Sequence, residues 1–410
     1  MNTVRTFLAV CCCLDYFVKQ YDIETAFLNG DLDEVVYMTV PTGMKVAADM
    51  VCQLRRSLYG LKQAAAVWFR TIRDVFRRAG FVQCAADTCL FAKRSGRAPV
   101  FVVLYVDDLL IGCKYEEDAE EVRRELAKHF TVKELGDVRY VLGMEVKYDK
   151  KKGELWLGQK QFIERMVDKF RQTDAYPVRN PILQGQELHV EDGPLITGVK
   201  PFRDLIGSLL WSTFALPGST AGEQAGIRVL RYLKGTSSTG IKFRRPQGSA
   251  CSVAVFCDAN WGGDIATRRS TSGILIQVAG APVVYKSKLQ QTVALSSAEA
   301  EYMSMALAVQ EVVWLRHLLE EMGLKAVGAT PVYVDNKSAI SIATNHGYTP
   351  RAKHIDLRAH FVRDHVAKET INVIHVPSAK QLADYLTKLL PTPQFTALLQ
   401  LSGVVSSDTS

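Results

Sequence analysis

The sequence predicts a multidomain protein of mixed α+β and α/β class. Its 410 residues are enough for roughly two to three domains. Hydrophobic residues make up 48% of the chain and charged residues 23%, which is typical of a globular protein with sizeable cores. Two apolar runs within residues 100–113 predict a buried β-hairpin. From Cys251 onward, short apolar strands and a long helix at residues 299–322 indicate an α/β arrangement.

The composition narrows the functional class. A formal net charge of +7 favours a polyanionic partner. The nine cysteines form no paired CxxC elements, so we expect reduced thiols in an intracellular protein and no zinc site. The apolar run at residues 7–14 is too short to span a membrane and no cleavage site follows it. We therefore expect a protein that is neither secreted nor membrane-spanning.

The remaining elements follow from periodicity. Before residue 175 we expect a helix and a strand leading into residues 22–30, helices at 64–76 and 116–130, and a hairpin formed by 142–146 and 154–157. Residues 175–250 are loop-rich, with helices expected at 202–214 and 227–233. After Cys251 we expect strands at 253–257, 274–279, 283–286 and 332–334, and a frayed tail at 402–410.

The hairpin at residues 100–113 carries two adjacent carboxylates, Asp107 and Asp108, between its apolar strands. Unpaired carboxylates are costly to bury, so this pair needs compensation, which divalent cations can provide. Mg²⁺ fits best because it prefers hard oxygen ligands. An Asp-rich surface turn without metal is the open alternative. Two-metal chemistry needs a third acid from elsewhere, and Asp22, on a predicted strand, is the candidate.

Four acids of the second half lie at element boundaries. Asp258 and Asp335 end predicted strands, Glu301 opens the long helix, and Asp384 lies in a C-terminal helical stretch. Two-metal hydrolysis of a phosphodiester requires several carboxylates as metal ligands, and these four acids are the candidates.

Four ordered motifs give a family resemblance. They are residues 22–30, the SLYGLKQA run at 57–64, YVDD at 105–108 and LGMEV at 142–146. Their order and spacing resemble copia-type LTR retrotransposon reverse transcriptases, and the acid motifs of the second half resemble the ribonuclease H domain that follows. The resemblance implies a right-hand polymerase palm and thumb with incomplete fingers at 1–174, a connection or thumb-like region at 175–250, a ribonuclease H-like α/β domain at 251–390, and a tail at 391–410.

The resemblance implies roles for matching residues of the polymerase part. Asp22, Asp107 and Asp108 would be the catalytic metal ligands. Phe27 would exclude a ribose 2′-hydroxyl, although plain core packing is its alternative, as it is for the hairpin at 142–146. The implied substrate-binding residues are Phe27, Gln63, Tyr105, Leu142, Gly143 and Met144, the last three holding the primer end.

For the ribonuclease H part, the resemblance implies four catalytic metal ligands, Asp258, Glu301, Asp335 and Asp384. Glu299 competes with Glu301, but the Ala-Glu-Tyr frame favours Glu301 and leaves Glu299 as an acid at the helix N-terminus. His354 and His375 are candidate proton shuttles, with a structural role as the alternative.

The resemblance also implies cofactors and partners. These are two Mg²⁺ ions per active site, with Mn²⁺ as a substitute, and an RNA template, a DNA primer, an RNA–DNA hybrid and deoxynucleoside triphosphates. The expected function is RNA-directed DNA polymerase and ribonuclease H activity.

Three departures from the family bear on activity. Residues 65 and 66 are Ala-Ala where the family usually has Pro-Arg, residues 217–224 resemble the scar of a deletion, and no basic fingers segment precedes Asp22. We therefore expect the ribonuclease H activity to persist better than the polymerase activity. The alternative is a non-catalytic, decayed remnant that binds nucleic acid.

Overall fold

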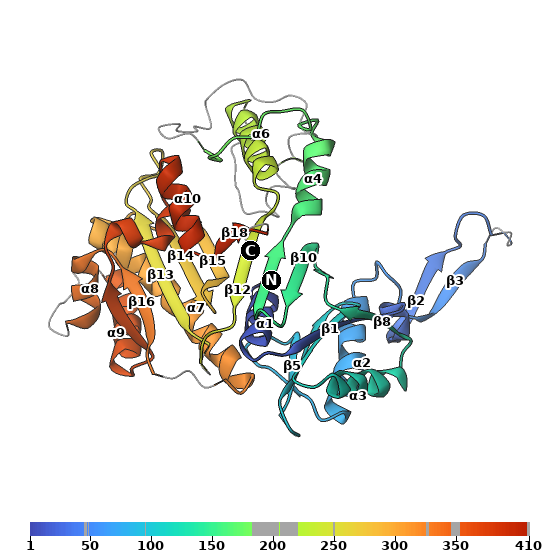
Figure 1. Cartoon of the computed structure of the whole chain (residues 1–410). Coiled ribbons are helices and arrows are strands. Elements are labelled where there is room, and N and C mark those ends of the chain that lie inside the picture. The colour runs from blue at the N-terminus through green and yellow to red at the C-terminus, as the bar shows by residue number, and fades with distance from the viewer. Residues whose placement is uncertain are drawn as a thin grey trace. The chain divides into compact units, whose positions relative to one another are not determined.

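The computed structural model describes residues 1–44, 47, 49–94, 96–182, 205, 220–248, 251–324, 328–345 and 353–407. The chain divides into two compact units, shown together in Figure 1. The first comprises Met1, Thr3–Val138 and Leu315–Lys325, and the second comprises Asn2, Arg139–Trp314 and Ala326–Ser410. The expected boundaries at residues 174, 250 and 390 stay predictions.

A six-stranded sheet forms the centre of the first unit, in the order β4-β5-β6-β7-β1-β8. Its strands are β1 (Phe17–Ile23), β4 (Val82–Gln83), β5 (Leu90–Lys93), β6 (Val100–Tyr105), β7 (Asp108–Cys113) and β8 (Val132–Asp137). β6 and β7 are the hairpin expected at 100–113, which is confirmed. The other elements are α1 (Asn2–Cys13), the 3₁₀ helix η1 (Ala26–Asn29), α2 (Ala64–Arg78), α3 (Glu116–Ala127) and the two-stranded ribbon β2 (Asp31–Thr39) with β3 (Val51–Arg56).

Helices complete the core of this unit. The face of α2 that bears Trp68, Ile72 and Phe76 is buried in one cluster with sheet residues, as its three- and four-residue spacing predicts. α1 approaches β7 closely at Gly112, where an added Cβ would lie 2.6 Å from the Cys11 Sγ atom. Glycine is therefore required at that position for α1 to pack on the sheet.

The second unit contains two five-stranded sheets. The first has the order β18-β12-β11-β10-β9. Its strands are β9 (Tyr140–Val141), β10 (Met144–Asp149), β11 (Glu154–Gly158), β12 (Thr239–Arg244) and β18 (Val404–Ser406), and the hairpin β10–β11 confirms the expected one. The helices α4 (Lys160–Lys169) and α6 (Thr220–Gly235) pack on each other, and α6 contains the helix expected at 227–233.

The expected frayed tail at residues 402–410 is wrong for residues 402–407. Val404–Ser406 form β18, which pairs with β12. The pairing is extended by a bond from the Lys242 N–H to the Gly403 carbonyl (2.9 Å) and one from the Ser407 N–H to the Ser238 carbonyl (2.8 Å). A three-residue strand carries too little periodic pattern to be seen in the sequence, and it forms because β12 offers backbone groups that need partners.

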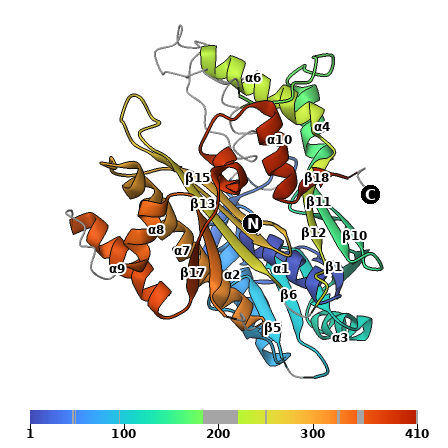
Figure 2. The same cartoon turned by 60° about the vertical axis from the view of Figure 1, so that its left-hand side comes forward.

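The second sheet of this unit has the order β15-β14-β13-β16-β17 (Figure 2). Its strands are β13 (Val253–Asn260), β14 (Thr271–Val278), β15 (Ala281–Leu289), β16 (Thr330–Val334) and β17 (Ile371–His375). The first four confirm the expected strands, whereas β17 was not expected from the sequence. Its helices are α7 (Ser297–Glu321), whose residues from Leu315 onward belong to the first unit, α8 (Lys337–Thr344), α9 (Lys353–Ala367), η2 (Ser378–Lys380), η3 (Leu382–Leu386) and α10 (Thr392–Leu401). β13 pairs antiparallel with β14 and parallel with β16.

Some of the elements expected between residues 175 and 250 lie largely outside the described residues. Of the helix expected at 202–214, the structure describes Leu205 alone, which is helical. The deletion expected near 217–224 stays a prediction. The nine cysteines are thiols that do not take part in disulfides, and five of them are buried. Among the helices of the described ranges, none combines the length and apolar character needed to cross a bilayer.

The contact between η3 and β14 generates a test of the packing. An added Cβ at Gly273 would lie 2.5 Å from Thr387 Cγ2 and 3.0 Å from the Ala383 carbonyl oxygen. We expect Gly273→Ala to lower the free energy of unfolding by about 1–3 kcal/mol through overpacking, measured by urea denaturation. Adding Thr387→Ser removes the clashing methyl group and should recover part of the loss. Wild-type stability of Gly273→Ala would contradict this packing.

Candidate active sites

Three acids of the second unit converge at one end of the β13–β17 sheet. One carboxylate oxygen from each of Asp258, Glu301 and Asp335 lies within 4.8 Å of the others. The parallel neighbours β13 and β16 bring Asp258 and Asp335 together because their carboxyl ends meet at the same edge of the sheet. Glu301 comes from the first turns of α7. Asp258 is fully buried, Glu301 is buried and Asp335 is half-buried.

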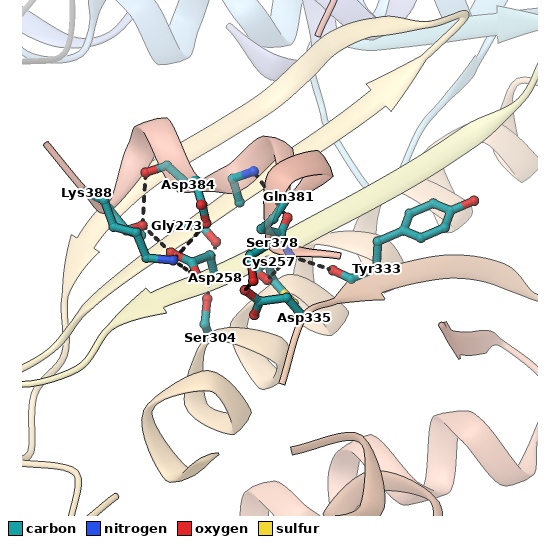
Figure 3. Close-up of polar contacts among 12 residues, drawn as sticks. Cys257, Asp258, Gly273, Ser304, Tyr333, Asp335, Ser378, Gln381, Asp384 and Lys388 are labelled. Atoms are coloured by element: carbon teal, nitrogen blue, oxygen red, sulfur yellow. Dashed lines mark hydrogen bonds and ion pairs between the residues drawn. The ribbon is translucent and has the colours of Figure 1, made fainter. Parts of the chain in front are cut away.

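The fourth predicted acid, Asp384, lies in η3 and is linked to this cluster through a lysine (Figure 3). The Lys388 Nζ atom lies 2.8 Å from Asp384 Oδ1 and 2.9 Å from Asp258 Oδ1. The Thr387 hydroxyl donates to the other oxygen of Asp258, and the Ser378 hydroxyl donates to Asp335 Oδ2 at 2.8 Å. The segment that contains η2 and η3 thus contacts three of the four acids.

Burial shifts the protonation of this site. Desolvation, followed by the neighbouring Asp258 and Asp335 carboxylates, raises the pKa of Glu301 to about 9. Desolvation also raises the pKa of Asp384 to about 6, although Lys388 acts against the shift. Burial alone would lower the pKa of Lys388, but the Asp258 and Asp384 carboxylates outweigh it and raise that pKa. The cluster holds more negative charge than its protein partners neutralise.

The residues present fit a divalent cation. The donor set consists of carboxylate oxygens, which Mg²⁺ and Mn²⁺ prefer. In addition, the Glu301 Oε2 atom is buried and has no hydrogen-bond partner among the described residues. A buried acceptor of this kind is costly unless a ligand completes it. Asp258, Glu301 and Asp335 can therefore hold a metal ion.

The structure separates the two competing glutamates. Glu299 Oε2 accepts a bond from the Leu295 N–H (2.8 Å), and the Glu299 N–H donates to the Ser296 hydroxyl (3.2 Å). Glu299 therefore stabilises the start of α7, whereas Glu301 joins the acid cluster. His375 is exposed at the end of β17, and the side-chain surroundings of His354 lie outside the described residues. The shuttle roles of both histidines stay predictions.

The acids of the first unit are adjacent but arranged differently. Asp22 on β1 lies directly opposite Asp108 on β7, and the Ile23 N–H donates to the Asp107 carbonyl at 3.1 Å. Asp107 Oδ2 accepts a 2.7 Å bond from the Tyr59 hydroxyl, and its Oδ1 atom is buried with no partner among the described residues. Across the described ranges, only the Asp258 cluster gathers three such side chains within 4.8 Å, so these three acids form a looser group.

The turn that carries Asp107 is strained. Val106 has a φ of 56°, a conformation that β-branched residues rarely adopt. Its carbonyl accepts a 2.7 Å bond from the Trp68 indole N–H, which helps to hold the turn. Burial, followed by the Asp107 carboxylate, raises the pKa of Asp22, and burial together with both neighbouring acids raises that of Asp108. The raised pKa values indicate that nearby cationic side chains do not balance the charge of the Asp22 and Asp108 carboxylates.

The substrate-binding residues expected from the sequence lie in both units. Phe27 in η1 packs on Tyr59 with ring centroids 4.3 Å apart, Gln63 immediately precedes α2, and Tyr105 is 50% exposed. Leu142 and Gly143 form the turn between β9 and β10 with φ values of 49° and 75°, and Met144 is buried. The hairpin residues belong to the second compact unit, and their role stays a prediction.

Sequence reasoning missed the residues that surround the acids. Lys388 could have been found, because it follows Asp384 by four residues, a spacing that places two side chains on one helical face. Tyr59, Ser378 and Thr387 contact acids distant in the chain, so no local pattern could have indicated them.

Comparison with known proteins identifies the family of the chain. Residues 1–184 match the family described as reverse transcriptase (RNA-dependent DNA polymerase). The chain is 34% identical over 433 residues to the Retrovirus-related Pol polyprotein from transposon TNT 1-94 of Nicotiana tabacum, covering 99% of this chain and 32% of that protein. The chain belongs to the copia-type retrotransposon Pol family. The Pol polyprotein from transposon RE1 of Arabidopsis thaliana is 33% identical over 420 residues, covering 98% of this chain and 28% of that protein.

This copia-type Pol chain thus spans about a third of the length of the curated relatives it matches. The solved structure of LC11-RNase H1 in complex with RNA/DNA hybrid aligns with 33% of this chain and 94% of that one, at 14% identity and a TM-score of 0.26. A TM-score this low does not establish a shared fold for the second unit. The expected fold class, a reverse transcriptase part followed by an α/β part, is confirmed.

The raised pKa of Glu301 predicts how cations should stabilise the protein. Folded Glu301 keeps its proton up to about pH 9, whereas the unfolded group loses it near its ordinary value of 4.5. Its contribution to the stability of the metal-free protein is therefore lost as the pH rises through this window. Cation binding needs the deprotonated carboxylate, so the increase in unfolding temperature on adding Mg²⁺ should grow with pH.

Calorimetry with and without Mg²⁺ checks this expectation. Glu301→Gln should flatten the pH dependence, because the amide does not titrate. A Mg²⁺ effect that is constant or shrinks from about pH 6 to about pH 9 would show that the cluster does not bind the ion.

Proposed function

We propose that the chain is the reverse transcriptase and ribonuclease H portion of a copia-type Pol polyprotein. Its nuclease part would cleave the RNA strand of RNA–DNA hybrids by metal-assisted hydrolysis. The observation that supports this best is the cluster of Asp258, Glu301 and Asp335, in which a buried Glu301 oxygen has no hydrogen-bond partner among the residues the structure describes. A structural ion pair would not leave that oxygen without a partner.

Each side chain has a task in this proposal. Asp258, Glu301 and Asp335 would hold Mg²⁺ or Mn²⁺, and Asp384 would complete the site for a second ion. When bound, such ions lower the pKa of a water and neutralise charge that develops on the phosphate. Lys388 neutralises part of the charge on Asp258 and Asp384. Its side chain would have to move away from these carboxylates as cations bind. Ser378 fixes the orientation of Asp335.

The substrate should be recognised by its shape and charge. Hybrids are read mostly through backbone and 2′-hydroxyl contacts instead of base edges. Cleavage should therefore tolerate many sequences and weaken as the salt concentration rises, because phosphate contacts release counterions.

The family match and the sheet register favour polymerase activity as the second function. Residues 1–184 match the reverse transcriptase family, and Asp22 lies opposite Asp108 beside Asp107. We propose these three acids as ligands for two Mg²⁺ ions that would serve primer extension with deoxynucleoside triphosphates. Because the three acids are more loosely grouped than the nuclease acids, we propose that polymerase activity is the weaker of the two.

Cleavage of a labelled RNA–DNA hybrid by the full chain tests the nuclease. Asp258→Asn removes a buried ligand and should reduce turnover by at least about 100-fold. Glu301→Gln should be nearly as damaging, whereas Glu299→Gln should act mainly on stability because Glu299 supports the start of α7. A folded wild-type chain that fails to cleave with Mg²⁺ or Mn²⁺ would favour the decayed remnant. An inactive Glu299→Gln beside an active Glu301→Gln would overturn the ligand assignment.

Primer extension on an RNA template tests the polymerase. Asp107→Asn should eliminate extension and leave hybrid cleavage unchanged, because Asp107 and Asp258 belong to different compact units. The matched control is Asp33→Asn, which changes an exposed acid of the β2–β3 ribbon and should preserve extension. If Asp107→Asn also abolished hybrid cleavage, the assignment of the two chemistries to separate sites would be wrong.

A further inference from the structure

Gln381 lies beside the acids Asp258, Asp335 and Asp384 (Figure 3). Its side chain is fully buried, although glutamine is normally exposed. The amide nitrogen Nε2 donates to the Cys257 carbonyl at 3.0 Å and to the Tyr333 carbonyl at 3.3 Å. The amide oxygen accepts a 3.2 Å bond from the Ala383 N–H. All the hydrogen-bonding capacity observed for this side chain is directed at backbone groups.

The two carbonyls belong to the strands that carry catalytic acids. Cys257 immediately precedes Asp258 on β13, and Tyr333 precedes Asp335 by two residues on β16. The register of β13 with β16 ends at the pair Phe256 and Tyr333. Beyond this pair, the Gln381 amide bonds to both strands. The distance between the backbones that carry the two acids therefore depends on this side chain.

The third bond connects the strands to the fourth acid. Ala383 immediately precedes Asp384, and the Gln381 side chain caps the N-terminus of η3, the helix that carries it. The Gln381 backbone carbonyl also accepts a bond from the Asp384 N–H (3.2 Å). One buried amide thus binds the backbone next to Asp258, Asp335 and Asp384.

We propose that Gln381 is a positioning residue that sets the spacing of Asp258, Asp335 and Asp384 for cation binding. The proposal rests on the metal-dependent nuclease function proposed above. Metal sites depend on groups that orient the ligands, and loss of such a group typically weakens metal affinity or activity. An amide suits this place because it offers donors and an acceptor without adding charge to an already acidic site.

The chain offers a matched control in Gln277. This glutamine is also buried, and its Nε2 atom donates to two backbone carbonyls, those of Gly280 (3.3 Å) and Ser402 (3.1 Å). Neither carbonyl adjoins one of the four acids. Gln277→Met therefore removes a comparable pair of hydrogen bonds from the same compact unit.

The experiment measures Mn²⁺ binding by electron paramagnetic resonance and hybrid cleavage as a function of Mg²⁺ concentration. The full chain carries Asp107→Asn throughout, so that the acids of the first unit contribute less to binding. Gln381→Met and Gln381→Glu should each weaken Mn²⁺ binding by about 10–100-fold and raise the Mg²⁺ requirement for cleavage. Gln381→Glu keeps an acceptor for the Ala383 N–H, so it serves if Gln381→Met fails to fold. Gln277→Met should change the unfolding temperature and leave Mn²⁺ affinity intact.

The outcomes separate this inference from the proposed nuclease. Folded Gln381 variants that bind Mn²⁺ as tightly as the parent would overturn it, as would an equal loss of affinity in Gln277→Met. A third outcome is that the Asp107→Asn parent binds Mn²⁺ and the Gln381 variants lose affinity, but none of these proteins cleaves hybrid. In that case the positioning role stands and the nuclease proposal falls. If the parent itself binds no Mn²⁺, both fall.

Discussion

The repulsion among buried carboxylates is the constraint on which the second unit depends. Asp258 and Glu301 lie in the protein interior, where water screens their charge poorly, and burial together with the Asp258 carboxylate raises the cost of ionising Glu301. A fold can tolerate such a group only if something compensates for it. Here Lys388 compensates on one side, and the Glu301 oxygen that has no hydrogen-bond partner within the described part of the chain lies where a cation could compensate.

The hydrogen-bonding groups around the cluster make this unfavourable arrangement persist. Ser378 and Thr387 each hold one acid, and Gln381 holds the backbones that carry them. These groups come from one segment that crosses the ends of β13 and β16. Its close packing on β14 depends on Gly273, because any larger residue would press against η3. Stability of the segment and geometry of the acids are therefore coupled.

Both acid groups of the chain bring carboxylates close together and hold them with hydrogen bonds, but their geometry differs. In the first unit a hairpin turn with a positive φ at Val106 presents Asp107, and Asp22 lies in register beside its neighbour Asp108. Tyr59 occupies one oxygen of Asp107. In the second unit a helix and two parallel strands gather the acids more tightly. This difference is the physical reason for our proposal that nuclease activity exceeds polymerase activity.

The sequence by itself determined many of the helices and strands, which residues carry the acids and which family the chain resembles. Hairpin 100–113, the long helix and the acid positions follow from local periodicity and motif order, which involve neighbours in the chain. Only the tertiary structure decided that Glu301 joins the cluster while Glu299 supports its helix, that the Gln381 amide bonds to both acid-bearing strands, and that residues 404–406 form a strand. These features depend on contacts between residues far apart in the chain, and such contacts leave no periodic pattern in the sequence.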